Sequence, residues 1–64
     1  MKRVPSKPVT PEIAALIKRM LREGVYQHQI AGVLGINQGR VSEVNTGKSH
    51  PKIPPAEQLP FNFR

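Results

Sequence analysis

The distribution of proline limits where this chain can form regular structure. All seven prolines lie near the two ends of the 64 residues, at Pro5, Pro8, Pro11, Pro51, Pro54, Pro55 and Pro60, and the 39 residues between Pro11 and Pro51 contain none. Proline removes a backbone donor and disrupts helices, so the folded body must lie in this interval. We expect an N-terminal arm (residues 1–9), a folded domain (residues 10–48) and a tail (residues 49–64).

The first part of the proline-free interval has the pattern of an amphipathic helix. Apolar residues recur at the spacing that forms one helical face, at Ile13, Leu16, Ile17, Met20 and Leu21. Thr10 is a suitable N-cap, Pro11 suits the first helical position, and Gly24 supplies a stop. The pattern predicts a helix over about residues 11–23. Its polar side carries Lys18, Arg19, Arg22 and Glu23.

Glycines divide the rest of the interval into two shorter segments. The first segment reads QHQIAGVL, with Ile30, Ala31 and Leu34 on one face of a short helix. Gly35 follows, and a turn there needs the positive φ angle that glycine adopts without steric cost. The second segment reads NQGRVSEVNT, in which Asn37 is a suitable N-cap and Val41 and Val44 share a face. The sequence predicts helix, tight turn, helix, with Gly47 as the final stop.

This arrangement resembles the helix-turn-helix of phage Cro and repressor proteins and of many bacterial regulators. The family places aliphatic residues where this chain has Ile30, Leu34, Ile36, Val41 and Val44, a small residue where it has Ala31, and glycine where it has Gly35. The resemblance covers about residues 10–48. It implies an all-α fold, in which a compact three-helix core contains the helix-turn-helix between an extended basic arm and a proline-rich tail.

The resemblance also implies that the last helix lies in the major groove of DNA. On a helical wheel, Val41 and Val44 mark the buried side of that helix. The residues we expect to read bases are Gln38, Gly39, Arg40, Ser42, Glu43 and Thr46. The residues we expect at phosphates are Tyr26, Gln27, Asn45, Lys48 and His50, with Lys2, Arg3 and Lys7 in the basic arm.

Several of these residues have more than one interpretation. Gln38 can pair bidentately with adenine, and Arg40 can bind guanine, a phosphate or the nearby Glu43. Glu43 can accept from cytosine or orient Arg40, and the latter is the stronger expectation. Gly39 replaces the longer polar side chain usual in the family; it either allows close approach to the groove or is only tolerated. The Tyr26 ring either packs on the first helix or directs its hydroxyl to a phosphate.

The charge balance favours a polyanionic partner. Ten Lys and Arg residues against four acidic ones give a net charge of +6, which suits a nucleic acid or an anionic surface better than a neutral one. A basic surface that only aids solubility is the alternative. No apolar run approaches the roughly 20 residues of a transmembrane helix, and no apolar stretch follows the basic N-terminus as in a secretory signal. We expect a cytoplasmic protein.

The sequence argues against an enzyme and against a bound cofactor or metal. It has no nucleophile–base pair and no phosphate-binding loop, and its four acidic residues are scattered at Glu12, Glu23, Glu43 and Glu57. It has no cysteine, and His28 and His50 are far apart. No feature indicates a small-molecule ligand.

The tail is too apolar for a simple linker, because it contains Ile53, Leu59, Phe61 and Phe63. It either folds back over the core or crosses to a second subunit, and a small core with exposed phenylalanines favours a homodimer. The leading functional prediction is a sequence-specific transcriptional regulator, a repressor that binds an inverted-repeat operator in double-stranded DNA. The alternatives are an accessory or architectural protein of recombination or excision, and a module that binds polymerase or another regulator.

Overall fold

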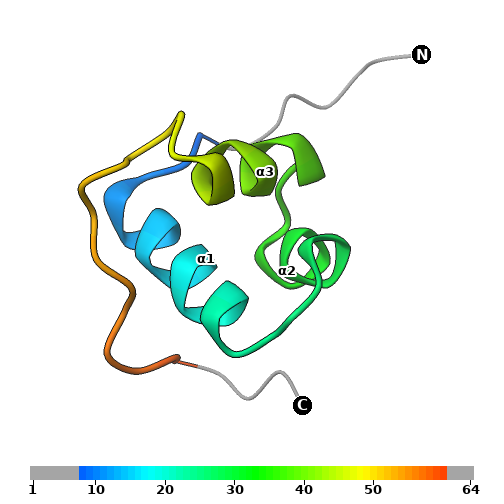
Figure 1. Cartoon of the computed structure of the whole chain (residues 1–64). Coiled ribbons are helices and arrows are strands. Elements are labelled where there is room, and N and C mark those ends of the chain that lie inside the picture. Colours follow the sequence, from blue (N-terminus) through cyan, green and yellow to red (C-terminus); the bar gives the residue numbers. More distant parts are fainter. Residues whose placement is uncertain (1–7, 61–64) are drawn as a thin grey trace.

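The computed structural model of the chain describes residues 8–60, and three helices account for its regular structure. These are α1 (Pro11–Arg22), α2 (Gln27–Leu34) and α3 (Gln38–Thr46). Figure 1 shows the three helices packed around one centre, with the tail passing along the outside of α1. The described residues contain no strand, so the prediction of an all-helical, three-helix core is confirmed for this part of the chain.

Local hydrogen bonds explain where α1 begins and ends. The Thr10 hydroxyl accepts a 3.2 Å bond from the Ile13 amide, which satisfies one of the free donors of the first turn. At the other end Gly24 has a φ of 87°, and the Val25 amide donates to the Met20 carbonyl at 3.0 Å. This pairing satisfies carbonyls that the end of a helix leaves free. The predicted helix was therefore correct to within one residue.

The core is formed by apolar residues from all three helices and the turn before α3. Its buried members are Ala14, Ile17, Met20, Ile30, Ala31, Ile36, Val41 and Val44. The predicted face of α1 was partly wrong, because Ala14 is fully buried whereas Leu16 is only half-buried. Leu16 lies about 100° around the helix from Ile17, so it falls at the edge of the buried face.

The connection between α2 and α3 is the predicted tight turn. Gly35 adopts the left-handed conformation, with φ 68° and ψ 35°. The Ile36 amide then donates to the Ala31 carbonyl at 3.0 Å, and the Ile36 side chain is buried in the core. The turn therefore ends α2 and at the same time fixes α3 against the rest of the molecule.

The described part of the tail, residues 49–60, folds back over its own chain. The Lys18 ammonium donates 2.6 Å bonds to the carbonyls of His50 and Ile53. The Ala56 amide donates to the Ala15 carbonyl at 3.0 Å, and Leu59 packs against the core. Of the two expectations for the tail, folding back is the one that these residues follow. Phe61 and Phe63 lie outside the described residues.

Within residues 8–60, none of the helices has the length and apolar character needed to span a lipid bilayer.

Candidate nucleic-acid interface

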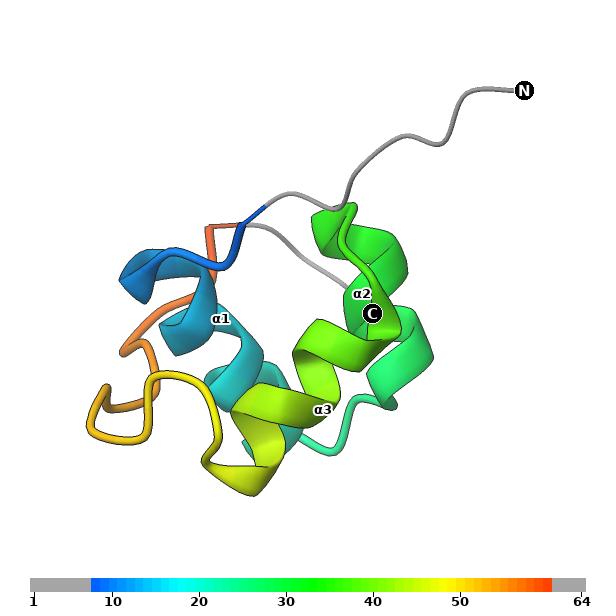
Figure 2. The same cartoon turned by 90° about the horizontal axis from the view of Figure 1, so that it is seen from above.

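The helix α3 carries half of the residues expected at DNA, among them all six expected to read bases. One side of the helix is fixed by Val41 and Val44, which are 0% and 2% exposed and belong to the core cluster. Figure 2 shows α3 lying against both α1 and α2. The residues expected to read bases lie off this buried side: Gln38, Gly39, Arg40 and Thr46 are exposed, and Ser42 and Glu43 are half-buried. All six thus lie off the fully buried positions of α3, although the wheel directs Ser42 and Glu43 away from Val41 and Val44 and these two are the half-buried members.

The beginning of α3 is closed by a short side-chain cap. Asn37 is the N-cap, and its side-chain oxygen accepts a 2.7 Å bond from the Gly39 amide. A Cβ atom at Gly39 would lie 3.1 Å from that same oxygen, which is closer than side chains normally approach. The absence of a side chain at Gly39 thus favours this cap. This relation gives Gly39 a structural reason that the sequence pattern did not reveal.

Arg40 and Glu43 form an ion pair on the exposed surface of α3. The Arg40 Nη1 and Glu43 Oε1 atoms lie 3.1 Å apart, and the two side chains are 51% and 44% exposed. This pairing is the contact that both interpretations of Glu43 and Arg40 require, whether Glu43 orients Arg40 toward DNA or the two form only a surface pair. An exposed pair with i, i+3 spacing contributes only a few tenths of a kcal/mol to stability. Its main effect is to limit the directions in which the guanidinium can point.

The end of α3 presents another group of polar residues. Asn45 and Lys48 are exposed, whereas the Thr46 hydroxyl donates a 3.3 Å bond back to the Glu43 carbonyl. Gly47 has a φ of 85° and ends the helix as predicted, and the Lys48 amide donates to the Glu43 carbonyl at 2.9 Å. The Lys48 side chain therefore follows α3 directly, at its carboxyl end.

Two of the expected phosphate contacts lie at the start of α2. Gln27 is half-buried, and Tyr26 is 69% exposed at the N-cap position. The Tyr26 ring stacks on the ring of His28, with centroids 5.9 Å apart and 9° between the planes. Packing of this ring against α1, one of the two interpretations above, is wrong, because a neighbour on α2 holds it at the surface.

His50 lies where the chain returns from α3 to α1. Its carbonyl accepts from Lys18, and its Nδ1 atom lies 2.8 Å from the Ser49 hydroxyl. The contact with Lys18 holds the half-buried His50 beside α1. The remaining expected phosphate contacts, Lys2, Arg3 and Lys7, lie outside the described residues.

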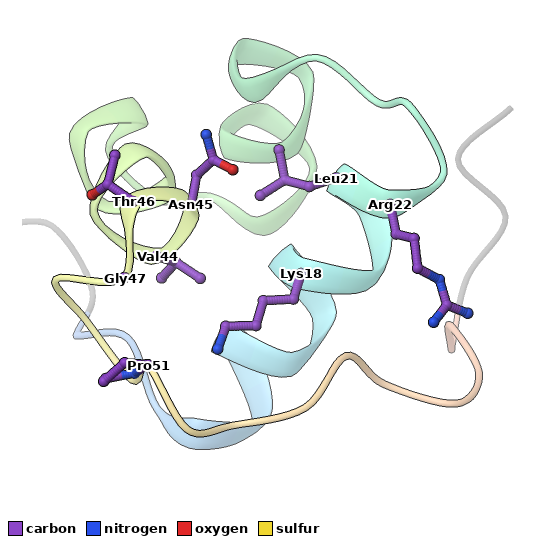
Figure 3. A pocket seen from close by; sticks show the side chains of 8 residues that line it. All are labelled: Lys18, Leu21, Arg22, Val44, Asn45, Thr46, Gly47 and Pro51. Carbon is purple, nitrogen blue, oxygen red and sulfur yellow. The ribbon is translucent and has the colours of Figure 1, made fainter.

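Two hollows border α3. The larger, of about 470 Å³, lies between α3 and the second half of α1, as Figure 3 shows. It is lined by Lys18, Leu21, Arg22, Val44, Asn45, Thr46, Gly47 and Pro51. The smaller hollow, of about 250 Å³, is bordered only by Asn37, Gly39, Arg40 and Glu43. Within residues 8–60, no three His, Cys, Asp or Glu side chains form a group that could hold a metal ion.

Comparison with models of known protein families, with curated proteins and with solved structures found no match.

Sequence reasoning missed the contacts that bind the tail to α1. Lys18 and Arg19 were placed on the polar side of the helix, yet the Arg19 guanidinium donates to the carbonyls of Ala56 and Glu57. Helical periodicity gives the direction of a side chain but not the segment that covers it. The one signal in the sequence is indirect, because the apolar residues of the tail require a surface to pack on.

Proposed function

We propose that this protein is a sequence-specific transcriptional regulator that binds double-stranded DNA by inserting α3 into the major groove. The observation that carries the proposal is the arrangement of α2 and α3, which are joined by a turn at Gly35. Val41 and Val44 attach α3 to the core and leave its polar side accessible. A helix fixed in this way can enter the roughly 12 Å width of the major groove as a rigid unit.

The composition of the surface supports a nucleic-acid partner. The chain has a net charge of +6, and basic side chains on a protein displace the counterions condensed on DNA. Gln38, Arg40, Asn45 and Lys48 give α3 and its end side chains that donate hydrogen bonds to bases or phosphates. Because Glu43 is paired with Arg40, its negative charge opposes phosphate binding less than a free carboxylate would.

We further propose that two copies act together in the cytoplasm on an inverted-repeat operator. A two-fold symmetric dimer places two recognition helices one turn of DNA apart, about 34 Å, so that each half-site receives the same contacts. Repression by blocking access of polymerase to the promoter is the simplest consequence of such binding.

Selection of bound sites from random double-stranded DNA tests this proposal directly. We expect a palindromic consensus, with half-sites separated by about one helical turn. Light scattering of the protein with the selected site should give two protomers per duplex. If no sequence is enriched over the starting pool, the protein is not a sequence-specific DNA-binding protein.

Footprinting on the DNA around the protein's own gene separates the regulator from the alternatives. A single protected palindrome at its promoter supports a regulator, whereas clustered sites at an attachment region indicate a recombination accessory protein. Retention of a protein partner at salt concentrations that abolish DNA binding would instead indicate an interaction module, because phosphate contacts weaken steeply as salt increases.

A further inference from the structure

The small hollow at the start of α3 is open because of Gly39. The Asn37 side chain bends over the first turn to cap the Gly39 amide, and a Cβ atom at Gly39 would meet its oxygen at 3.1 Å. The cap and the missing side chain leave a hollow of about 250 Å³ on the exposed surface. A flat group can therefore approach the α3 backbone more closely here than beside a helix turn with an ordinary side chain.

The hollow is also lined by the ion pair of Arg40 and Glu43, which forms one wall of it. A guanidinium has five N–H donors, and the 3.1 Å contact with Glu43 Oε1 uses one of its two Nη1 donors. Adjacent donors in the guanidinium plane stay available for a bidentate contact. Glu43 keeps its second carboxylate oxygen as an acceptor. The wall thus presents two donors followed by one acceptor.

This order matches one of the four base-pair edges of the major groove. A guanine–cytosine pair shows, from the guanine side, the acceptors N7 and O6 and then the N4 amino donor of cytosine. We propose that the hollow at Gly39 receives this edge, with Arg40 donating to guanine and Glu43 accepting from the cytosine amino group. The proposal rests on the function proposed above, because it specifies which base pair α3 reads.

The other three base-pair edges fit this wall poorly. An adenine–thymine pair shows acceptor, donor, acceptor, so the adenine amino group meets an Arg40 donor and thymine O4 meets the Glu43 carboxylate. Reversing either pair also leaves two mismatched contacts. In each reversed pair an amino group meets an Arg40 donor, and the purine N7, an acceptor, lies opposite Glu43. Mismatched polar groups lose their hydrogen bonds to water without replacement, so each wrong pair weakens binding.

Measured base preference at each position of the selected half-site tests the assignment. For the full chain, we expect one position at which guanine–cytosine binds about 5- to 100-fold more tightly than the other pairs. Arg40→Ala should remove most of that preference. Glu43→Gln should relax it toward all three other pairs, because each of them places an acceptor opposite residue 43, to which an amide can donate while a carboxylate cannot.

Matched variants control for the loss of charge. Arg22→Ala removes an exposed arginine of α1, and Glu57→Gln neutralises an exposed glutamate of the tail, so both should leave the preference at this position unchanged. Far-UV circular dichroism of each variant verifies the fold. If a consensus exists but Arg40→Ala and Glu43→Gln leave every position unchanged, the base assignment is overturned and DNA recognition stands. If no consensus exists, the proposed function itself fails.

Discussion

The Lys18 ammonium on α1 lies 2.6 Å from the backbone carbonyl oxygen of His50, which follows 32 positions later in the chain. This contact joins the first helix to the segment that leaves the last helix. Together with the bond from Lys18 to the Ile53 carbonyl, it makes the described tail part of the folded unit. One charged donor thus binds two carbonyls of the tail, and the His50 carbonyl also accepts a 3.3 Å bond from the Ile53 amide.

Removal of this donor should destabilise the protein. Lys18→Met keeps much of the aliphatic stem but leaves the carbonyls of His50 and Ile53 without their shared partner. Hydrogen bonds to charged groups contribute about 1.5–3 kcal/mol each in favourable cases, and partial exposure reduces this, so we expect a loss of about 1–2 kcal/mol in urea denaturation. Lys52→Met, at an exposed lysine of the tail, is the control and should change stability little. Equal effects of the two variants would show that the bonds contribute nothing specific.

Leu59 should be the apolar anchor of the described tail. Its side chain is half-buried and packs against the core, while the adjacent Gln58 is exposed. Full burial of a leucine contributes about 1.5–3 kcal/mol, so Leu59→Ala should lower the free energy of unfolding by about 1 kcal/mol. Gln58→Ala should have a much smaller effect. Amide hydrogen exchange at Ala56, which donates to Ala15, should also accelerate in the leucine variant; unchanged exchange would contradict this role.

The elements of the fold could be predicted from sequence because their signals are local. Thr10, Gly35 and Asn37 act through bonds to residues within a few positions, so their roles follow from residue type and spacing alone. The path of the tail could not be predicted in the same way. Its contacts join Lys18 and Arg19 to carbonyls more than 30 positions away. Every residue has a backbone carbonyl, so the sequence does not indicate which of them will accept these bonds.

The candidate site was predictable to a similar depth. Periodicity was sufficient to place Val41 and Val44 on the buried side of α3, but it directed Ser42 and Glu43 away from that side, and these two are half-buried. It did not explain Gly39, whose reason is a contact with the side chain of Asn37. A helical wheel gives the direction in which each side chain leaves the helix. It does not give the conformation of that side chain, so it cannot show that Asn37 bends over Gly39.

Substitution by alanine should change the stability of the protein in opposite directions at two glycines that lie three residues apart. Gly32 lies within α2, with open space where a Cβ would be placed, so Gly32→Ala should stabilise the protein by about 0.5–1 kcal/mol. Gly35 has a φ of 68°, where a side chain costs about 1–2 kcal/mol, so Gly35→Ala should destabilise by that amount. Thermal denaturation of both variants measures the difference. Destabilisation by Gly32→Ala would show that a partner or the helix packing needs that surface bare.

The cap of α3 should affect stability through Asn37. Asn37→Ala removes the 2.7 Å bond to the Gly39 amide and should cost about 1 kcal/mol, whereas Asn37→Ser retains a good capping oxygen and should cost less. Gly39→Ala should then stabilise the protein when combined with Asn37→Ala, because the crowding oxygen is absent. Gly39→Ala in the otherwise unchanged protein should stabilise it less than in the Asn37→Ala background, and a double-mutant cycle measures this difference. Additive effects would show that the 3.1 Å approach imposes no constraint.

Lys48 should contribute affinity for DNA without contributing base preference. Its exposed side chain follows the end of α3, and a phosphate contact there would release one condensed counterion. Lys48→Ala should weaken binding about equally for all sequences and reduce the slope of log affinity against log salt by about 1. Arg40→Ala should instead reduce discrimination between bases. Titrations at several salt concentrations, with Lys52→Ala as the matched lysine control, separate the two roles. If Lys48→Ala changes the base preference and leaves the slope of log affinity against log salt unchanged, Lys48 contacts a base and not a phosphate.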